Sequence, residues 1–247
     1  MCTLIAAWRV FEDTPICVAA NRDEAVDRPS SPPRVRDREG EPAVLAPRDE
    51  RAGGTWLGYN EAGLLAAVTN RWVPGSGERS RGLLVDDCLG ERSTVDAVTL
   101  VRTELDRRSY APFHLLLADG ETCRLLVHDG DGEVRARRLP PGVHIVVNVG
   151  VDGEWFCPEN RPEAGRRQAR NAERVRAELR PENDETAAEW TARAGTVLGD
   201  HEYGVCIHGE GFGTRSSSLL RLGEERVFEF ADGPPCEAAF RRVDASV

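Results

Sequence analysis

Short apolar runs separated by turn residues dominate the first part of the chain and predict β-strands. Two of them, Thr3–Val10 and Ile16–Ala20, flank a turn at Glu12–Pro15 and predict a hairpin that begins at the N-terminus. A second hairpin is predicted from Thr55–Tyr59 and Leu64–Thr69, because the four residues between them end in glycine. The chain therefore opens with antiparallel strand pairs.

The segment between these two hairpins, Asp27–Arg51, predicts a long ordered loop. It contains five prolines. Proline lacks the backbone N–H that a central strand or a helix interior needs, so we expect no regular element there.

Apolar residues at helical spacing occur in two later regions. Gly82–Leu105 predicts two helices separated near Gly90, and Glu163–Leu179 and Glu185–Leu198 predict two more. The remaining apolar runs predict strands at Phe113–Ala118, Cys123–His128, Val134–Leu139, Val143–Val149, Tyr203–His208, Ser216–Leu222 and Arg226–Phe230. With no repeat or linker in the sequence, this order predicts a single domain over residues 1–247. The expected fold class is α+β, with two sheets and helices on their outer faces.

The composition is that of an ordinary globular protein, with 247 residues, 40% apolar and 30% charged. The 42 acidic residues outnumber the 32 basic residues, all of them arginine, and the net charge is −10. This acidic balance argues against a general nucleic-acid binder, which needs a basic face for the phosphates. An acidic surface without lysine also fits a GC-rich genome and a salt-loving host.

The sequence contains no candidate for a membrane anchor. No apolar stretch approaches the roughly 20 residues that a membrane-spanning helix requires. The N-terminus has no basic region before its first apolar run, so a secretory signal is not expected. We therefore expect a cytoplasmic protein without membrane insertion, and the sequence leaves the oligomeric state open.

The cysteines and histidines show no ligand spacing in the sequence. The seven cysteines form no Cys-x-x-Cys pair, so we expect reduced thiols and neither a disulfide framework nor a zinc site. We interpret the five histidines as structural or surface residues: His114, His128, His144, His201 and His208. The sequence therefore predicts no metal.

Cys2 is the first residue with candidate chemistry. Removal of Met1 would leave a cysteine whose thiol and α-amino group belong to one residue. An α-amino group titrates near pH 8, so part of it is unprotonated at neutral pH and can act as a base for the thiol. The alternative is a small apolar residue at the start of an edge strand.

Four polar residues, Asn21, Arg22, Asp23 and Glu24, follow the second strand of the first hairpin. The hairpin brings them to the end of the sheet that carries Cys2, where they could orient its amine or bind a substrate carboxylate. A solvated turn with an Arg–Asp pair is the alternative, and such a pair contributes less than about 1 kcal/mol.

A third group of residues surrounds Trp56, where Gly53, Gly54 and Gly58 indicate close approach of the backbone. Asn70 ends the following strand. Its side-chain amide could donate a hydrogen bond to the oxyanion of an acyl transfer, a contact worth roughly 3 kcal/mol. An ordinary turn asparagine is the alternative.

In their order along the chain, these motifs resemble the transport and Golgi organisation protein 2 family, which is known for an Asn-Arg-Asp-Glu (NRDE) motif. The segments that carry the resemblance span nearly the whole chain: Met1-Cys2, Ala20–Glu24 with Arg28-Pro29, Gly53–Gly58, Thr69-Asn70, Arg81–Val85 and Gly213–Ser217. The resemblance implies the fold of the N-terminal-nucleophile (Ntn) hydrolases, a four-layer αββα sandwich.

The N-terminal half also resembles the cysteine amidohydrolases related to bile-salt hydrolase and penicillin acylase. In that resemblance Cys2 corresponds to the nucleophile, Asn70 to an oxyanion donor, Asn148 to a second amide and Arg215 to an active-site arginine. Those enzymes carry Arg and Asp three residues apart, whereas the four residues of the NRDE motif are contiguous here. Which of the four faces the thiol stays open.

The first function expected is that of an Ntn-type amidohydrolase, in which Cys2 attacks an amide carbon of a small molecule and its own amine moves the proton. No cofactor is required. The catalytic candidates are Cys2, Asn70, Asn148 and Arg215, and the candidates for substrate binding or orientation are Asn21, Arg22, Asp23, Glu24 and Trp56.

The second function expected is that of a non-catalytic carrier on the same scaffold. The resemblance to eukaryotic members of the family implies haem handling, so haem or another amphipathic compound is the ligand in this alternative. The one haem-like feature of the sequence is Cys157-Pro158, since a Cys-x-x-Cys-His attachment site is absent.

Overall fold

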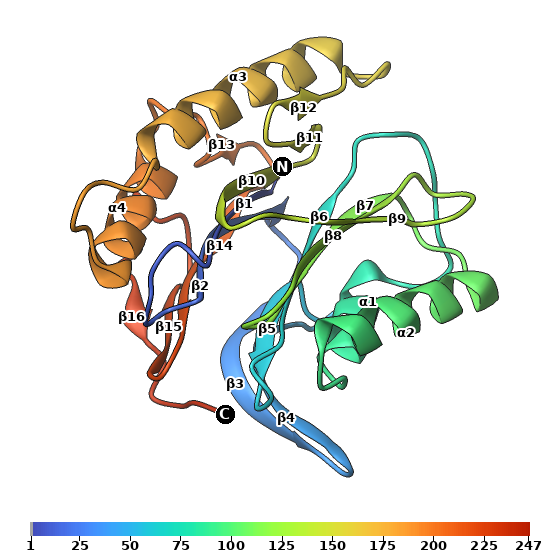
Figure 1. Cartoon of the computed structure of the whole chain (residues 1–247). Helices are drawn as coiled ribbons and strands as arrows, with labels where there is room; N and C mark the ends of the chain where they lie inside the picture. The colour runs from blue at the N-terminus through green and yellow to red at the C-terminus, as the bar shows by residue number, and fades with distance from the viewer. Residues whose placement is uncertain (1) are drawn as a thin grey trace. The chain divides into compact units, whose positions relative to one another are not determined.

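The computed structural model describes residues 2–247, so Met1, whose removal the predicted nucleophile needs, lies outside the described residues. The chain forms two compact units, each with its own antiparallel sheet (Figure 1). Unit 1 comprises the segment up to Asp27 and Pro141–Val243, and unit 2 comprises Arg28–Pro140 and Asp244–Val247. The single domain over residues 1–247 stays a prediction.

Unit 1 is built around four neighbouring strands: β10 (Gly142–Val147), β1 (Thr3–Trp8), β2 (Ile16–Ala25) and β14 (Phe212–Leu222), in this order across the sheet. Further strands extend the sheet: β11 (Gly150–Val151), β12 (Glu154–Trp155), β13 (His208–Gly209), β15 (Arg226–Ala231) and β16 (Arg241–Arg242). Every residue of β1 is buried, so this strand lies in the interior of the sheet on both faces.

Two helices pack against the sheet of unit 1 (Figure 1). The first, α3 (Pro162–Glu178), contacts β10, and the second, α4 (Ala187–Gly199), contacts β2 and β14. Only a narrow stripe of side chains is buried on α3. The N-terminus of α4 is fixed by a reciprocal pair of hydrogen bonds between Thr186 and Glu189, which satisfies backbone donors that a helix end leaves open.

Unit 2 contains a sheet of seven strands in chain order: β3 (Ser30–Arg38), β4 (Glu41–Asp49), β5 (Leu57–Asn60), β6 (Leu65–Asn70), β7 (Phe113–Ala118), β8 (Cys123–His128) and β9 (Arg135–Arg138). The helices α1 (Arg81–Cys88) and α2 (Thr94–Arg107) bury their apolar side chains against it and form one hydrophobic core. The described residues thus confirm the predicted α+β class, with two antiparallel sheets and four helices. No helix among them is long and apolar enough to cross a membrane.

The predicted loop over Asp27–Arg51 is wrong, because this segment forms the strand pair β3–β4. Two of the prolines lie in an edge strand, at an irregularity of its pairing, where proline is tolerated. The strand β3 is an edge of the sheet, and Pro32 and Pro33 lie where the register between β3 and β4 shifts. On its other side, β4 pairs with β5 at Val44 and Leu45, which are not prolines.

The predicted strand over Tyr203–His208 is also wrong. Residues 201–204 form turns, and pairing with β14 begins only at His208. Gly204 has a φ of +63°, a left-handed conformation that turns the chain and that glycine adopts without strain.

Gly54 lies where the backbone of unit 2 leaves no space for a side chain. A β-carbon on Gly54 would lie 2.2 Å from the carbonyl carbon of Gly82, in the first turn of α1. The adjacent Thr55 donates its backbone N–H to the Gly82 oxygen over 3.0 Å. The glycines around Trp56 thus include one that is needed for close backbone approach, as their spacing indicates.

We expect Gly54→Ala to lower the free energy of unfolding by roughly 1–3 kcal/mol, because the start of α1 must move away from the added carbon. Gly120→Ala is the matched control, since a β-carbon there meets no atom within 4 Å. Thermal unfolding of both variants measures the difference. Equal Tm values for the two variants would show that the close approach of Gly54 to α1 does not contribute to stability.

Candidate active site

Cys2 lies immediately before β1, between the ends of two neighbouring strands. Thr3 pairs with Asn21 of β2 on one side and with Val147 of β10 on the other. Continuing this register by one residue places Cys2 beside Arg22 and Asn148. The hairpin therefore brings the NRDE motif to the end of the sheet that carries Cys2, as the sequence predicts.

The backbone nitrogen of Cys2 is held by a buried amide. It donates to Asn148 Oδ1 over 3.2 Å, and Asn148 Oδ1 also accepts a hydrogen bond from Gln168 Nε2 of α3 over 2.9 Å. Asn148 is fully buried in the turn after β10. Since both neighbours are donors, the amide oxygen is the end that faces them. Asn148 thus positions the nitrogen of Cys2, and its predicted role toward an oxyanion stays a prediction.

Gln168 is a residue of this site that the sequence analysis did not identify. Its side chain is 2% exposed and lies on the buried stripe of α3. A glutamine on a stripe whose other members are small or apolar is the signal in the sequence, because a buried amide needs hydrogen-bond partners.

The Cys2 thiol is close to the NRDE motif. Its Sγ lies 3.8 Å from the backbone oxygen of Asp23. Burial raises the pKa of the thiol above its ordinary value of 9.0, and the negative charge of Asp23 acts in the same direction. The sulfur is therefore protonated at neutral pH, and attack on a carbonyl carbon needs a base that removes this proton.

Asp23 is a buried carboxyl group at the same strand end. Thr214 Oγ1 of β14 donates to Asp23 Oδ1 over 2.6 Å and itself accepts the backbone N–H of Ile207 over 2.9 Å. Burial raises the pKa of Asp23 from 3.8 to about 6. The Asp23 side chain thus connects the NRDE motif to the segment before β13. Thr214 lies in the Gly213–Ser217 segment that carries the family resemblance, but the sequence predicts no role for it.

The raised pKa of Asp23 predicts a pH-dependent stability. Because the folded state binds this proton more tightly than the unfolded state, the contribution is complete below about pH 4 and is lost as the pH rises through about 6. Two pKa units correspond to about 3 kcal/mol. We expect Asp23→Asn, which is neutral at every pH, to flatten the dependence of the unfolding free energy on pH in this range. Urea unfolding of both proteins between about pH 4 and 7 measures this. If the unfolding free energies of the two proteins change in parallel with pH, Asp23 is not the source of the pH dependence.

Asn21 and Arg22 point to opposite faces of β2, because side chains alternate along a strand. Asn21 Nδ2 donates to the backbone oxygens of Leu198 (3.1 Å) and Val205 (3.0 Å), so Asn21 ties β2 to the end of α4 and the following loop. Arg22 is buried, with 5% of its surface exposed. Glu24 is half-buried, and its carboxylate accepts a backbone N–H from the next residue. The substrate-orienting roles of all four residues of the NRDE motif stay predictions.

Arg215 is the extra residue of a β-bulge. The strand β14 pairs Thr214 with Asp23 and Ser216 with Arg22, and the register shifts between them. Bulges occur often beside active sites, where they redirect a side chain. Among the described residues, Arg215 Nε is a buried nitrogen without a hydrogen-bond partner. Leaving such a donor unsatisfied costs about 1–3 kcal/mol, so an anionic ligand bound there would stabilise it.

Asn70 and Trp56 belong to unit 2. Asn70 is exposed at the end of β6, where it pairs with Phe113 of β7. Trp56 is half-buried before β5, and its backbone oxygen accepts the N–H of Val68 over 2.9 Å. Within unit 1, Cys2 thus contacts Asp23 of the NRDE motif and Asn148, and Arg215 lies on β14 at the bulge opposite Arg22 and Asp23. The roles of Arg215, Asn70 and Trp56 stay predictions.

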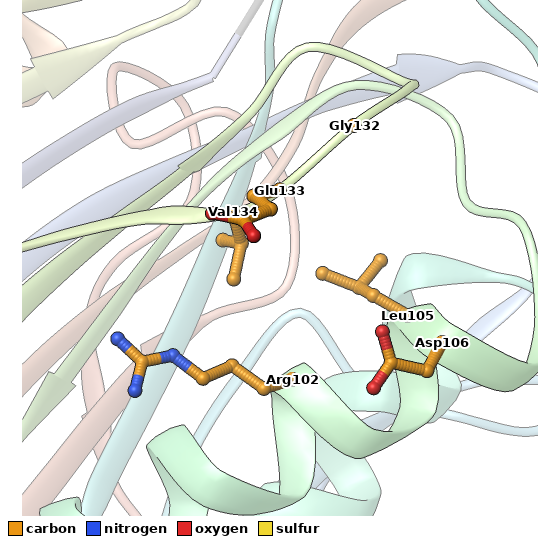
Figure 2. A pocket seen from close by; sticks show the side chains of 6 residues that line it. All are labelled: Arg102, Leu105, Asp106, Gly132, Glu133 and Val134. Atoms are coloured by element: carbon orange, nitrogen blue, oxygen red, sulfur yellow. The ribbon is translucent and has the colours of Figure 1, made fainter.

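A surface pocket of about 660 Å³ lies in unit 2 (Figure 2). It is lined by Arg102, Leu105 and Asp106 of α2 and by Gly132, Glu133 and Val134 of the segment before β9. Figure 2 shows the two groups of side chains across from each other. The lining contains no nucleophile and none of the candidate site residues, so we assign no chemistry to it.

The fold is similar to that of solved structures with the Ntn-hydrolase architecture. Penicillin V acylase from Agrobacterium tumefaciens has a TM-score of 0.57 and 15% identity, with 93% of this chain and 82% of that one covered. A C2A mutant of conjugated bile acid hydrolase from Clostridium perfringens has a TM-score of 0.58 and 12% identity, with 100% of this chain and 97% of that one covered. An N-acylethanolamine-hydrolyzing acid amidase orthologue from Caenorhabditis elegans has a TM-score of 0.58 and 14% identity, with 88% of this chain and 92% of that one covered. At these identities the likeness shows the shared fold alone.

Residues 1–232 match the model of the family described as Transport and Golgi organisation 2, and the chain belongs to this family. The Bos taurus homologue is 28% identical over 241 residues, which cover 88% of this chain and 85% of the homologue. The Mus musculus homologue is 31% identical over 150 residues, which cover 57% of this chain and 52% of the homologue. The match thus spans about half the length of the mouse relative. The resemblance drawn from the motifs is confirmed.

Proposed function

We propose that this protein hydrolyses an amide bond of a small acyl compound, with the Cys2 thiol as nucleophile. The observation that carries the proposal is the hydrogen bond from the Cys2 nitrogen to Asn148 Oδ1, because this nitrogen becomes the α-amino group once Met1 is removed. The structural relatives are named as an acylase, a bile acid hydrolase and an acid amidase, and one of them was solved as a C2A mutant. Their chemistry supports a hydrolase with a reactive residue at position 2.

The mechanism needs a base within reach of a thiol that is protonated at neutral pH. The α-amine of Cys2 takes the thiol proton while the sulfur attacks the carbonyl carbon and forms a tetrahedral intermediate. Asn148 Oδ1 accepts one amine hydrogen and so orients the amine. The intermediate collapses to a thioester as the leaving amine takes the proton from the Cys2 ammonium group. Water, deprotonated by the same amine, then hydrolyses the thioester and restores the thiol.

Two arginines near this strand end favour an anionic substrate. Arg215 supplies a buried Nε donor at the bulge, and Arg22 is beside Cys2 in the strand register. Guanidinium groups bind carboxylates with paired, charge-assisted hydrogen bonds. We therefore propose an acyl compound that carries a carboxylate, such as an N-acyl amino acid.

The experiment that tests this function compares N-acyl amino acids with N-acyl amines of the same acyl chain, using the full-length protein and detection of the released amine. We expect turnover of the carboxylate-bearing series at a higher kcat/KM, by roughly 10-fold or more for one charge-assisted contact. Arg215→Gln should remove most of this preference while the N-acyl amines react as before. Absence of both turnover and thioester formation in all compounds would contradict the proposal.

Haem binding stays a prediction of the family resemblance. Cys157, the residue of the Cys-Pro pair, is exposed in unit 1, where its sulfur contacts the backbone oxygen of Pro162 and the guanidinium group of Arg166. A haem titration with Cys157→Ser as control tests this alternative. A stoichiometric shift of the Soret band that depends on Cys157 would favour the carrier.

A further inference from the structure

Two cysteines and two histidines converge in unit 1 at a place that the proposed mechanism does not use. His201 and Cys206 lie in the connection after α4, His208 lies in β13, and Cys236 lies in the loop after β15. One ligand atom from each lies within 4.8 Å of the other three. The sequence shows no such site, because Cys236 is 28 positions after His208 and only the fold brings them together.

We propose that these four residues form a structural zinc site. The three closest atoms lie near the spacing of zinc ligands, with two of their three separations inside the expected range and one slightly shorter. Cys206 Sγ lies 3.5 Å from Cys236 Sγ and 3.5 Å from His208 Nε2, and His208 Nε2 lies 3.1 Å from Cys236 Sγ. With Zn–S and Zn–N bonds of about 2.3 and 2.0 Å, the ligand atoms of a tetrahedral site are about 3.3–3.8 Å apart.

His201 completes the set of four ligands. Its ring centroid lies 5.1 Å from that of His208, and the two rings are inclined by 69°. The two rings therefore do not stack, and His201 presents a ring nitrogen within the 4.8 Å span of the cluster. Two sulfur and two nitrogen donors in tetrahedral arrangement are the donor set of structural zinc.

The surroundings of His208 resemble those of a metal-binding histidine. Its Nε2 faces the two sulfurs, whereas its Nδ1 lies 3.9 Å from Glu237 Oε1. A histidine that binds a metal through one nitrogen commonly directs the other toward a carboxylate, which sets the ring orientation. Glu237 follows Cys236 directly, so one segment supplies both a ligand and its supporting carboxylate.

The two segments that carry the ligands are ordered by contacts of their own. Asn171 of α3 donates to the backbone oxygen of Gly204 over 3.0 Å, which holds the loop between His201 and Cys206. The backbone N–H of Glu237 donates to the Pro234 oxygen over 2.9 Å and closes a turn around Cys236. Because the ligands are placed by existing hydrogen bonds, a metal needs to order little of the chain when it binds.

A disulfide between Cys206 and Cys236 explains the cluster less well. Both cysteines are free, and their 3.5 Å sulfur separation exceeds the bond length of about 2.05 Å. A disulfide would also leave the convergence of two histidines on the same point without a role. A metal site uses all four side chains.

The site would fix the segment that supports the NRDE motif. Cys206 lies between Val205, whose oxygen binds Asn21, and Ile207, whose N–H binds the Thr214 hydroxyl that holds Asp23. A zinc ion that joins Cys206 to Cys236 therefore links this segment to the loop after β15. We expect the metal to raise the Tm of the folded chain without contact to the substrate.

The test measures the metal content of the full-length protein, purified in reducing buffer without chelator, by inductively coupled plasma mass spectrometry. We expect one equivalent of zinc. Cobalt(II) added to the metal-free protein should give the visible bands of a tetrahedral ion together with thiolate-to-cobalt charge transfer. Cys236→Ser and His201→Ala, both at exposed positions, should weaken metal binding by more than roughly 100-fold, since loss of an outer partner alone costs 10–100-fold.

Two variants serve as controls. Cys157→Ser, at an exposed cysteine outside the cluster, should keep the full metal content. Cys2→Ala should keep it as well, which separates the zinc site from the proposed nucleophile. A folded, reduced protein that retains no zinc and gives no tetrahedral cobalt spectrum would overturn the proposal. So would an intact mass that shows a Cys206–Cys236 disulfide in reducing buffer.

Discussion

Cys2→Ala is expected to abolish hydrolysis of the N-acyl substrates, with a loss in kcat of at least roughly 10⁴-fold. The variant removes the sulfur on which the thioester forms. The proposed mechanism contains no other nucleophile for this step. Cys2→Ser keeps a hydroxyl group at the same position. Because an alcohol is a weaker nucleophile than a thiol that can ionise, we expect strongly reduced but measurable turnover. Initial rates with saturating substrate check both variants.

The control for these variants is Cys157→Ser, which removes an exposed thiol from the same unit and should leave the rates unchanged. Equal Tm values for Cys2→Ala and wild type show that the fold is kept, since Cys2 precedes β1 and contributes no strand pairing. Turnover at the wild-type rate in folded Cys2→Ala would exclude Cys2 as the nucleophile.

Asn148→Asp is expected to move the rising limb of the kcat/KM profile to higher pH. The carboxylate would lie beside the Cys2 amine, where Asn148 Oδ1 now accepts its hydrogen over 3.2 Å. A nearby negative charge stabilises the protonated amine and raises its pKa, so less of the base is present at neutral pH. At pH values on the rising limb, a shift of one pH unit lowers kcat/KM about 10-fold.

The matched control for Asn148→Asp is Asn60→Asp. Asn60 is also a fully buried asparagine, at the end of β5, where its Nδ2 donates to the backbone oxygens of Leu89 and Glu91. Its replacement should lower stability, because a buried carboxylate cannot donate to those backbone oxygens, and should leave the pH profile in place. An unchanged limb in Asn148→Asp would show that Asn148 does not hold the catalytic base.

The sequence predicts the core of the candidate site because short hairpins fix register. The turn at Glu12–Pro15 leaves little choice in how the first two strands pair, so Thr3 lies opposite Asn21 and Cys2 lies next to the NRDE motif. The predicted strand Val143–Val149 includes Asn148, whereas β10 ends at Val147 and Asn148 lies in the turn after it. The hairpin contact depends on a local connection that a single sequence shows, whereas the pairing of β1 with β10 that brings Asn148 to Cys2 is long-range.

The contacts that the sequence does not predict depend on tertiary position. Proline is excluded from central strands but tolerated on an edge, and the sequence does not show that β3 is the edge strand. Gln168 contacts Asn148 only because α3 packs on β10. The zinc cluster likewise joins segments on two sides of β14 and β15, so its ligands have no regular spacing in the sequence.

The central claim is that Cys2 is a processed N-terminal nucleophile, and intact mass spectrometry after treatment with a thiol-reactive acylating probe tests it most directly. We predict a mass without Met1 that carries one acyl group, assigned to Cys2 by peptide mapping and lost when the protein is unfolded before labelling. Retained Met1, or acyl groups spread over the exposed Cys157 and Cys236 without preference for Cys2, would contradict the claim.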